Sequence, residues 1–144
     1  MEPVLKSEYI ESGTLRLEWR DFPYLGQESV NAAVAARAAQ EQGKFWEYHD
    51  ILYQKQKGEN TGAFSDEKLL GFAQEAGLDV GRFEAAFKSG KYEATVQKVF
   101  REAQNAGIQG TPSFSINGQV LVGFQPPEIF ERAIEEEARK AENG

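Results

Sequence analysis

The chain has 144 residues, of which 40% are hydrophobic and 12% aromatic, so it can form one domain with a core and is too apolar to be disordered. Its net charge of −7 argues against a general nucleic-acid-binding protein, which needs clustered lysine and arginine. It contains no cysteine and one histidine, so we expect no disulfide, no thiolate chemistry, no metal site and no other cofactor.

The N-terminal region predicts two elements and no targeting segment. Residues 2–12 predict the end of a helix that Gly13 caps. In residues 14–22, Leu15, Leu17 and Trp19 alternate with charged side chains, which predicts a strand with one solvent-exposed face. No apolar run approaches the roughly 20 residues that span a bilayer, and the N-terminus does not resemble a signal peptide. As written, the chain would stay in the cytoplasm.

From residue 29 to residue 106 the pattern is helical almost throughout. Ser29 and Ser65 are expected N-caps, and glycines end most of the helices. We expect His49 to be a packed or capping histidine, because no serine or cysteine partner for a general base is evident. Helical spacing likewise favours packing of Trp46, Tyr48 and Tyr53 over a ligand groove. The expected helices cover residues 29–43, 44–56, 66–77, 79–90 and 91–107.

After Gly110 the pattern changes to strands. Residues 113–116 and 120–124 flank Asn117-Gly118, which predicts a β-hairpin. Pro126-Pro127 then begins a last helix, whose charged tail over residues 135–144 is expected to fray. The residues of that helix expected to face the core are Ile129, Phe130, Ala133 and Ile134.

This order of elements resembles the DsbA-like thioredoxin-fold thiol–disulfide oxidoreductases over nearly all of the chain. Three stretches are similar to that family: YIESGTLRLEWRDFPYLGQES, AAVAARAAQEQGKFWEYHDILY and AQNAGIQGTPSFSINGQVLVGFQPPEIFERAI. The resemblance implies an α/β, thioredoxin-like fold with a large helical insertion in one domain. Residues 1–26 and 107–144 would form the thioredoxin part, and residues 27–106 the insertion.

The sequence departs from the family at its start. Members open with a strand that runs into a Cys-x-x-Cys at the start of the first helix, where the helix N-terminus lowers the pKa of the first thiol. Residues 2–12 resemble the second half of that helix. The resemblance therefore implies that the first strand, the start of the helix and the Cys-x-x-Cys lie upstream of Met1, so the chain is N-terminally truncated. As written, it has no catalytic residue and should be inactive in thiol exchange.

The part of the family's site that remains is Gly110, Thr111 and Pro112. The resemblance implies that Pro112 follows a cis peptide bond and faces the active-site disulfide, and that the Thr111 backbone pairs with an extended substrate peptide. Protein thiols or disulfides would be the partners. Two alternatives stay open. One is a non-catalytic peptide-binding or scaffold domain that keeps this groove. The other is a glutathione-dependent isomerase or transferase, which acts through a serine near the missing region.

The missing strand would lie in the middle of the sheet, between residues 14–22 and 113–117. Its absence leaves unpaired backbone edges, and each buried unmade hydrogen bond costs about 1–3 kcal/mol. The edges could close on each other, pair with a second chain, or stay open with shifted helices. We expect self-association through this region. Family members often work outside the cytoplasm, so the compartment stays undetermined.

Overall fold

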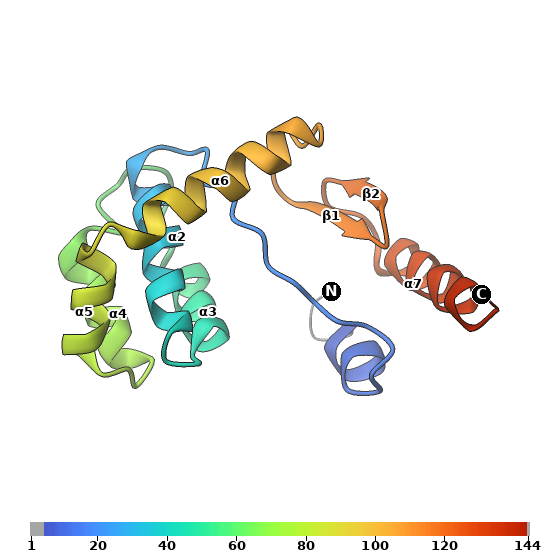
Figure 1. The fold of residues 1–144 in the computed structure, drawn as a ribbon, viewed down its shortest axis with the longest axis horizontal. Helices are drawn as coiled ribbons and strands as arrows, with labels where there is room; N and C mark the ends of the chain where they lie inside the picture. The colour runs from blue at the N-terminus through green and yellow to red at the C-terminus, as the bar shows by residue number, and fades with distance from the viewer. Residues whose placement is uncertain (1–4, 144) are drawn as a thin grey trace. The chain divides into compact units, whose positions relative to one another are not determined.

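The computed structural model describes residues 5–143, which form two compact units (Figure 1). We call Asp21–Gly107 the helical unit, and residues 5–20 together with 108–143 the hairpin unit. Each unit is described by itself. Between residues 5 and 143, no helix combines the length and the apolar character needed to cross a membrane.

The helical unit contains the five helices expected between residues 29 and 106, with shifted ends. Helix α2 packs against each of the other four. It can do so because Ala35, Ala38 and Ala39 are fully buried, and their small side chains let neighbouring backbones approach closely. The helices are α2 (Gln27–Gln40), α3 (Phe45–Lys55), α4 (Asp66–Glu75), α5 (Val80–Lys88) and α6 (Lys91–Asn105).

Large side chains fill the spaces around α2. Tyr48 and Phe83 are fully buried, with their ring centroids 5.3 Å apart. The Tyr48 hydroxyl donates a hydrogen bond of 2.9 Å to the carbonyl oxygen of Leu69, so its polar atom is satisfied inside the core. Burial raises the pKa of Tyr48 far above its ordinary value, so the phenol stays neutral.

The N-terminus of α2 differs from the prediction. Ser29 lies inside the helix, and Gly26 occupies the N-cap position with φ 101°. A Cβ atom at Gly26 would lie 2.5 Å from the Asn60 side chain, whose amide donates a 3.0 Å hydrogen bond to the Leu25 carbonyl. The Glu28 carboxylate accepts a hydrogen bond of 2.7 Å from the N–H of Gly62. Contacts with residues far along the chain therefore fix where this helix starts. Ser65, by contrast, is the N-cap of α4 as predicted.

The hairpin unit contains η1 (Lys6–Ile10), β1 (Ser113–Ile116), β2 (Gln119–Val122) and α7 (Pro127–Glu142). The predicted hairpin is confirmed: the strands are antiparallel, with Phe114 opposite Leu121. Asn117 and Gly118 both have positive φ, as a two-residue type I′ turn requires. The helix end expected over residues 2–12 is present as the π-helical turn η1, with residues 2–4 outside the described part.

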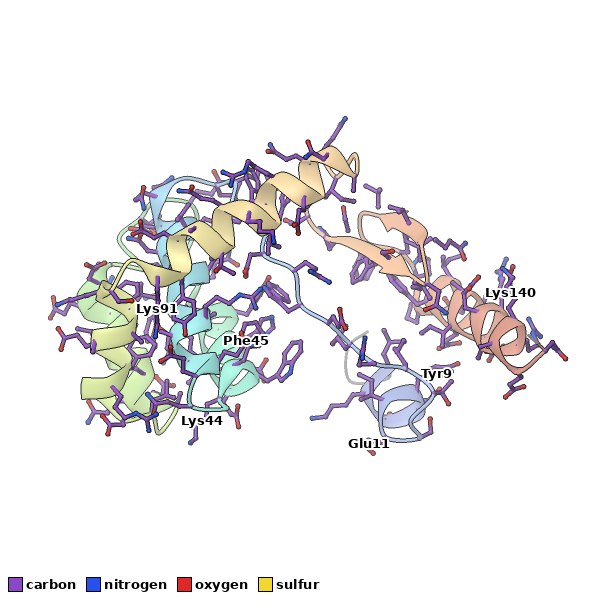
Figure 2. The ribbon with its side chains drawn as sticks, in the orientation of Figure 1. Tyr9, Glu11, Lys44, Phe45, Lys91 and Lys140 are labelled. Carbon is purple, nitrogen blue, oxygen red and sulfur yellow. The ribbon has the colours of Figure 1, made fainter. Side chains whose placement is uncertain are left out.

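Helix α7 covers one face of this hairpin. Phe130, Ala133 and Ile134 are buried as predicted, and the Phe130 ring meets Phe114 edge-on at 4.8 Å. Residues 135–142, which belong to the tail expected to fray, are helical in the structure. Lys140, labelled in Figure 2, lies 2.9 Å from the Glu136 carboxylate and 2.7 Å from that of Glu137. These pairs, three and four residues apart, support the last turns.

The strand expected over residues 14–22 is not formed. Within residues 5–143 the only sheet is β1–β2, and the segment runs as extended chain from one unit to the other. Alternation of apolar and charged residues specifies which face of a strand would be buried, but a strand also needs a neighbouring backbone to bond. The edges of residues 14–22 and β1 therefore do not close on each other in this structure.

Candidate functional site

The three predicted site residues lie together on the segment that precedes β1. Thr111 and Pro112 are exposed and Gly110 is half-buried, and the peptide bond between Thr111 and Pro112 is cis. The Gly110 carbonyl oxygen accepts a 2.7 Å hydrogen bond from the Ser113 hydroxyl. The segment is thus tied to the first residue of the strand while Thr111 and Pro112 face solvent.

The backbone at this segment has one bonded edge and one open edge. The N–H of Gly123 donates a 2.8 Å hydrogen bond to the Pro112 carbonyl, which extends the ladder between β1 and β2 by one pair. Because antiparallel pairs alternate, the N–H and C=O groups of Ser113 and Ser115 point away from β2. Thr111 makes no backbone hydrogen bond with any residue that the structure describes. Thr111, Ser113 and Ser115 therefore offer donors and acceptors to an extended chain.

On the hairpin face opposite α7, the side chains of β2 and of Phe124 are apolar and exposed. Val120, Val122 and Phe124 are 50%, 64% and 76% exposed. Val120 and Val122 share a face of β2, since residues two apart point to the same side of a strand. Sequence reasoning missed this surface, although three consecutive apolar residues, Val120, Leu121 and Val122, place apolar side chains on both faces of β2.

Aromatic side chains form a row on one face of α3. The ring of His49 lies 5.3 Å from that of Trp46 and 4.7 Å from that of Tyr53. His49 is buried, and its Nδ1 lies 3.0 Å from the Asp50 carboxylate, so the expectation of a packed histidine is confirmed. Tyr48 is in the core as expected, whereas Tyr53 is 60% exposed and packs against His49 outside the core. Tyr53, four residues after His49, lies on the same side of α3 as Trp46.

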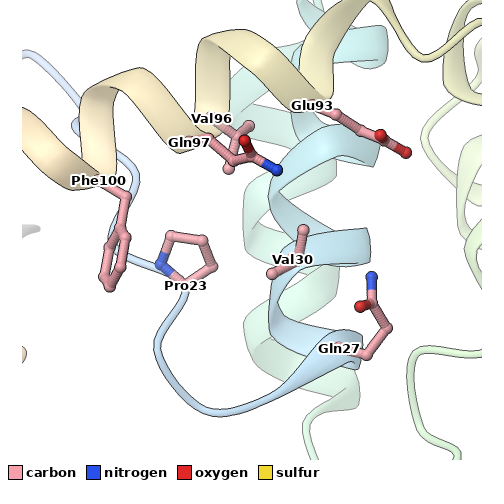
Figure 3. Close-up of a pocket in the computed structure, with 7 residues that line it drawn as sticks. All are labelled: Pro23, Gln27, Val30, Glu93, Val96, Gln97 and Phe100. Carbon is pink, nitrogen blue, oxygen red and sulfur yellow. The ribbon is translucent and has the colours of Figure 1, made fainter.

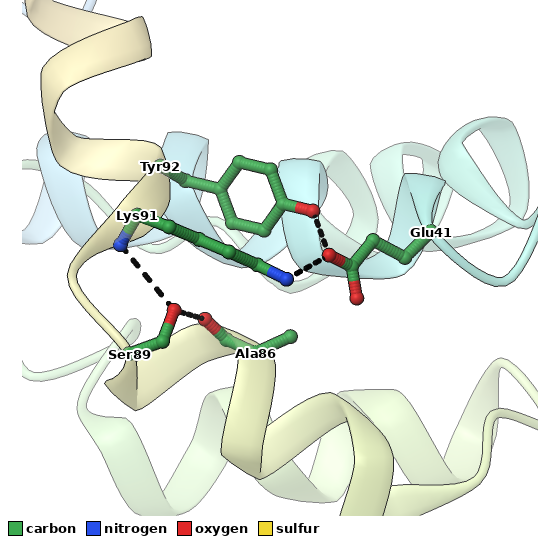
Figure 4. A network of polar contacts seen from close by, with 5 residues as sticks. All are labelled: Glu41, Ala86, Ser89, Lys91 and Tyr92. Atoms are coloured by element: carbon green, nitrogen blue, oxygen red, sulfur yellow. Dashed lines mark hydrogen bonds and ion pairs between the residues drawn. The ribbon is translucent and has the colours of Figure 1, made fainter.

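Charged pairs anchor the helical unit at two places. Arg37 donates to the same oxygen of the buried Asp21 through Nε at 2.7 Å and through Nη2 at 2.6 Å. Figure 4 shows the second place, where Lys91 and Tyr92 at the start of α6 both bond the Glu41 carboxylate. The hydrogen bonds from Lys91 and Tyr92 lower the pKa of Glu41. Neither place brings three metal-ligating side chains together, and nor does the rest of residues 5–143.

Residues 2–136 match the family model described as thioredoxin. This chain belongs to the thioredoxin family. A probable disulfide bond formation protein D from Bacillus anthracis is 33% identical over 143 residues, which cover 96% of this chain and 64% of the relative. The chain thus spans less than two thirds of that relative's length.

Two solved structures show the same fold. BdbD from Bacillus subtilis in its oxidised form superposes with a TM-score of 0.85 at 21% identity, covering 95% of this chain and 76% of the other. The thiol–disulfide exchange protein alpha-DsbA2 from Wolbachia pipientis gives 0.70 at 28% identity, covering 81% and 62%. The thioredoxin-like fold and the DsbA-like thiol–disulfide oxidoreductase family, both predicted from the sequence, are confirmed.

Proposed function

We propose that this protein exchanges thiols and disulfides with other proteins, and that residues 1–144 supply the peptide-contacting segment without performing the exchange. The observation that carries the proposal is the segment Gly110–Pro112 at the open edge of β1, with Thr111 and Pro112 exposed, in a chain of this family that contains no cysteine. We also propose residues 1–26 and 107–144 as the thioredoxin part and 27–106 as the insertion. The two compact units divide after Arg20 and after Gly107. The second division supports the limit near residue 107, whereas the first lies six residues before the proposed limit at residue 26.

The chemistry explains the expected inactivity. In thiol–disulfide exchange a thiolate attacks one sulfur of a disulfide, forms a mixed disulfide and releases the other sulfur as a thiolate. The only sulfur atom in residues 1–144 is the thioether of Met1, which cannot ionise. We therefore expect the 144-residue chain to reduce insulin disulfides with dithiothreitol no faster than buffer does. Turnover above that background would disprove the proposed division of roles.

Peptide contact is tested separately on the open edge of β1. Proline in place of Ser115 removes an N–H that points away from β2, so it takes a donor from the edge and none from the hairpin ladder. We expect the extended probe acetyl-Thr-Val-Thr-Val-Thr-amide to shift the amide resonances of Thr111, Ser113 and Ser115. Ser115→Pro should abolish the shift at Thr111, whereas Ser115→Ala, which keeps the N–H, should retain it. Equal binding by both variants would disprove pairing at this edge.

A non-catalytic peptide-binding or scaffold domain is the second candidate, and the open edge of β1 favours it equally. The two candidates differ in the DNA upstream of the Met1 codon. An in-frame run that encodes a strand and a Cys-x-x-Cys supports the oxidoreductase, and an in-frame stop codon supports the scaffold.

We further propose that the open edge of β1 lets two copies of the chain pair. Backbone pairing between two identical edges would make a four-stranded sheet from two hairpins and would satisfy the open N–H and C=O groups of β1. Sedimentation velocity should show a dimer that Ser115→Pro converts to a monomer. A wild-type monomer at micromolar concentration would contradict the pairing.

A further inference from the structure

A hollow of about 500 Å³ lies in the helical unit, between the start of α2, the segment before it and one side of α6 (Figure 3). All of its lining residues belong to Asp21–Gly107, so it is complete within one unit. It is distinct from the Gly110–Pro112 segment and takes no part in the proposed exchange.

One end of the hollow is apolar. Phe100 and Pro23 face each other there, and Val30 and Val96 continue the wall towards the opposite end (Figure 3). Val96 is 1% exposed, so its side chain is held in place by the surrounding core and forms the base of the hollow. The Phe100 ring is held by the ring of Phe22, with centroids 4.7 Å apart. An apolar side chain placed here would lose its hydration against a preformed surface.

The other end of the hollow is polar. Glu93 and Gln27 lie there and Gln97 lies beside Val96, and among the described residues no lysine or arginine lines the hollow (Figure 3). The Glu93 carboxylate forms no ion pair with any residue between 5 and 143. The Gln27 side-chain nitrogen donates to Asn31 at 2.8 Å, which leaves the Gln27 carbonyl oxygen as an acceptor. A carboxylate without an ion-pair partner, in a hollow that no described lysine or arginine lines, complements a cation.

We propose that this hollow binds a segment of a partner polypeptide in which an apolar side chain is followed by lysine or arginine. The apolar side chain lies against Phe100 and Val30, and the ammonium or guanidinium group reaches Glu93. The hydrocarbon stems of lysine and arginine suit the intervening wall, because such side chains cover apolar surface while their charged ends stay polar. The net charge of −7 also draws basic segments towards the protein.

The test compares short peptides that differ only in the apolar side chain or in the charged side chain that follows it. The probes are acetyl-Phe-Lys-amide, acetyl-Phe-Glu-amide and acetyl-Gly-Lys-amide, titrated into the isotope-labelled 144-residue chain and followed by amide resonances. We expect saturable shifts at Val30, Val96 and Gln97 with the first probe. Each of the other two should bind about two- to fivefold more weakly, as a partly exposed ion pair or a lost apolar contact implies.

Three variants distinguish binding in the hollow from general electrostatic attraction. Glu93→Gln should remove the preference for the lysine probe over the glutamate probe, whereas Glu102→Gln, the same change on the same helix outside the hollow, should keep it. Val30→Thr, which preserves size, should weaken both phenylalanine probes equally. The proposal is overturned if Glu93→Gln and Glu102→Gln have the same effect, or if millimolar acetyl-Phe-Lys-amide shifts none of the lining residues. An inactive protein in the insulin assay leaves these outcomes unaffected.

Discussion

The helical unit and the hairpin unit bury their apolar residues in different ways. In the helical unit, α2 is packed on several sides and its alanines, Tyr48 and Phe83 are almost inaccessible. In the hairpin unit, α7 covers the Phe114 face, while Val120, Val122 and Phe124 stay exposed and β1 keeps an open edge. The helical unit therefore satisfies its own packing, whereas the hairpin unit leaves an apolar surface and a strand edge exposed.

The largest effect is expected from the core of the hairpin unit. Phe130→Ala removes the ring that α7 packs on Phe114, and deletion of a buried phenylalanine side chain costs about 3–5 kcal/mol. Hydrogen exchange should accelerate in β1, β2 and α7 while the amides of α2 stay protected. Val122→Ala is the matched control, and its exposed side chain should leave exchange unchanged. Accelerated exchange throughout α2 would show that the two units do not unfold independently.

A smaller loss is expected at the buried ion pair of the helical unit. Asp21→Asn leaves the Arg37 guanidinium without its carboxylate, which costs about 3 kcal/mol, at the low end for a buried pair because Gln40 still accepts from Arg37 at 3.0 Å. Urea denaturation monitored by circular dichroism measures this loss. The double variant Asp21→Asn, Arg37→Met should be more stable than the single one, because it leaves no unpaired charge. The same stability in both would mean that the ion pair is not the cause.

The smallest effect concerns the exposed pair at the start of α6, and it depends on pH. Lys91 and Tyr92 hold the pKa of Glu41 below its usual 4.5 in the folded protein. The stabilisation is therefore present above about pH 4.5 and is lost as the pH falls through the lower, folded-state value. Glu41→Gln should lower the urea midpoint slightly at pH 7 and leave it unchanged at pH 2. A difference that persists at pH 2 would assign the effect to something other than this charge.

The helices and the hairpin could be predicted because residues close together in the sequence determine them. Periodicity and glycine stops located α2 to α6, and Asn117-Gly118 fixed the turn by its positive φ angles. The predictions failed where a distant residue decides the outcome. Residues 14–22 have a strand pattern but no paired neighbour, and the start of α2 depends on Asn60 rather than on Ser29.

The candidate site divides in the same way. Gly110, Thr111 and Pro112 are contiguous, so a resemblance to a family motif was enough to predict that they act together. The hollow beside α6 joins Pro23 to Phe100, which are far apart in the sequence, and no local pattern connects them. The exposed face of β2 could be assigned only after the register of the hairpin and the position of α7 were known.

The contacts at the start of α2 also bear on the order in which the chain folds. Asn60 bonds the Leu25 carbonyl, and the N–H groups of Gly62 and Phe64 bond the Glu28 carboxylate. A ribosome that has released residues 21–40 has therefore delivered the whole of α2 but not the groups that secure its first turn. That turn is completed only after residue 64 leaves the exit tunnel, by which time the whole of α3 has also been synthesised.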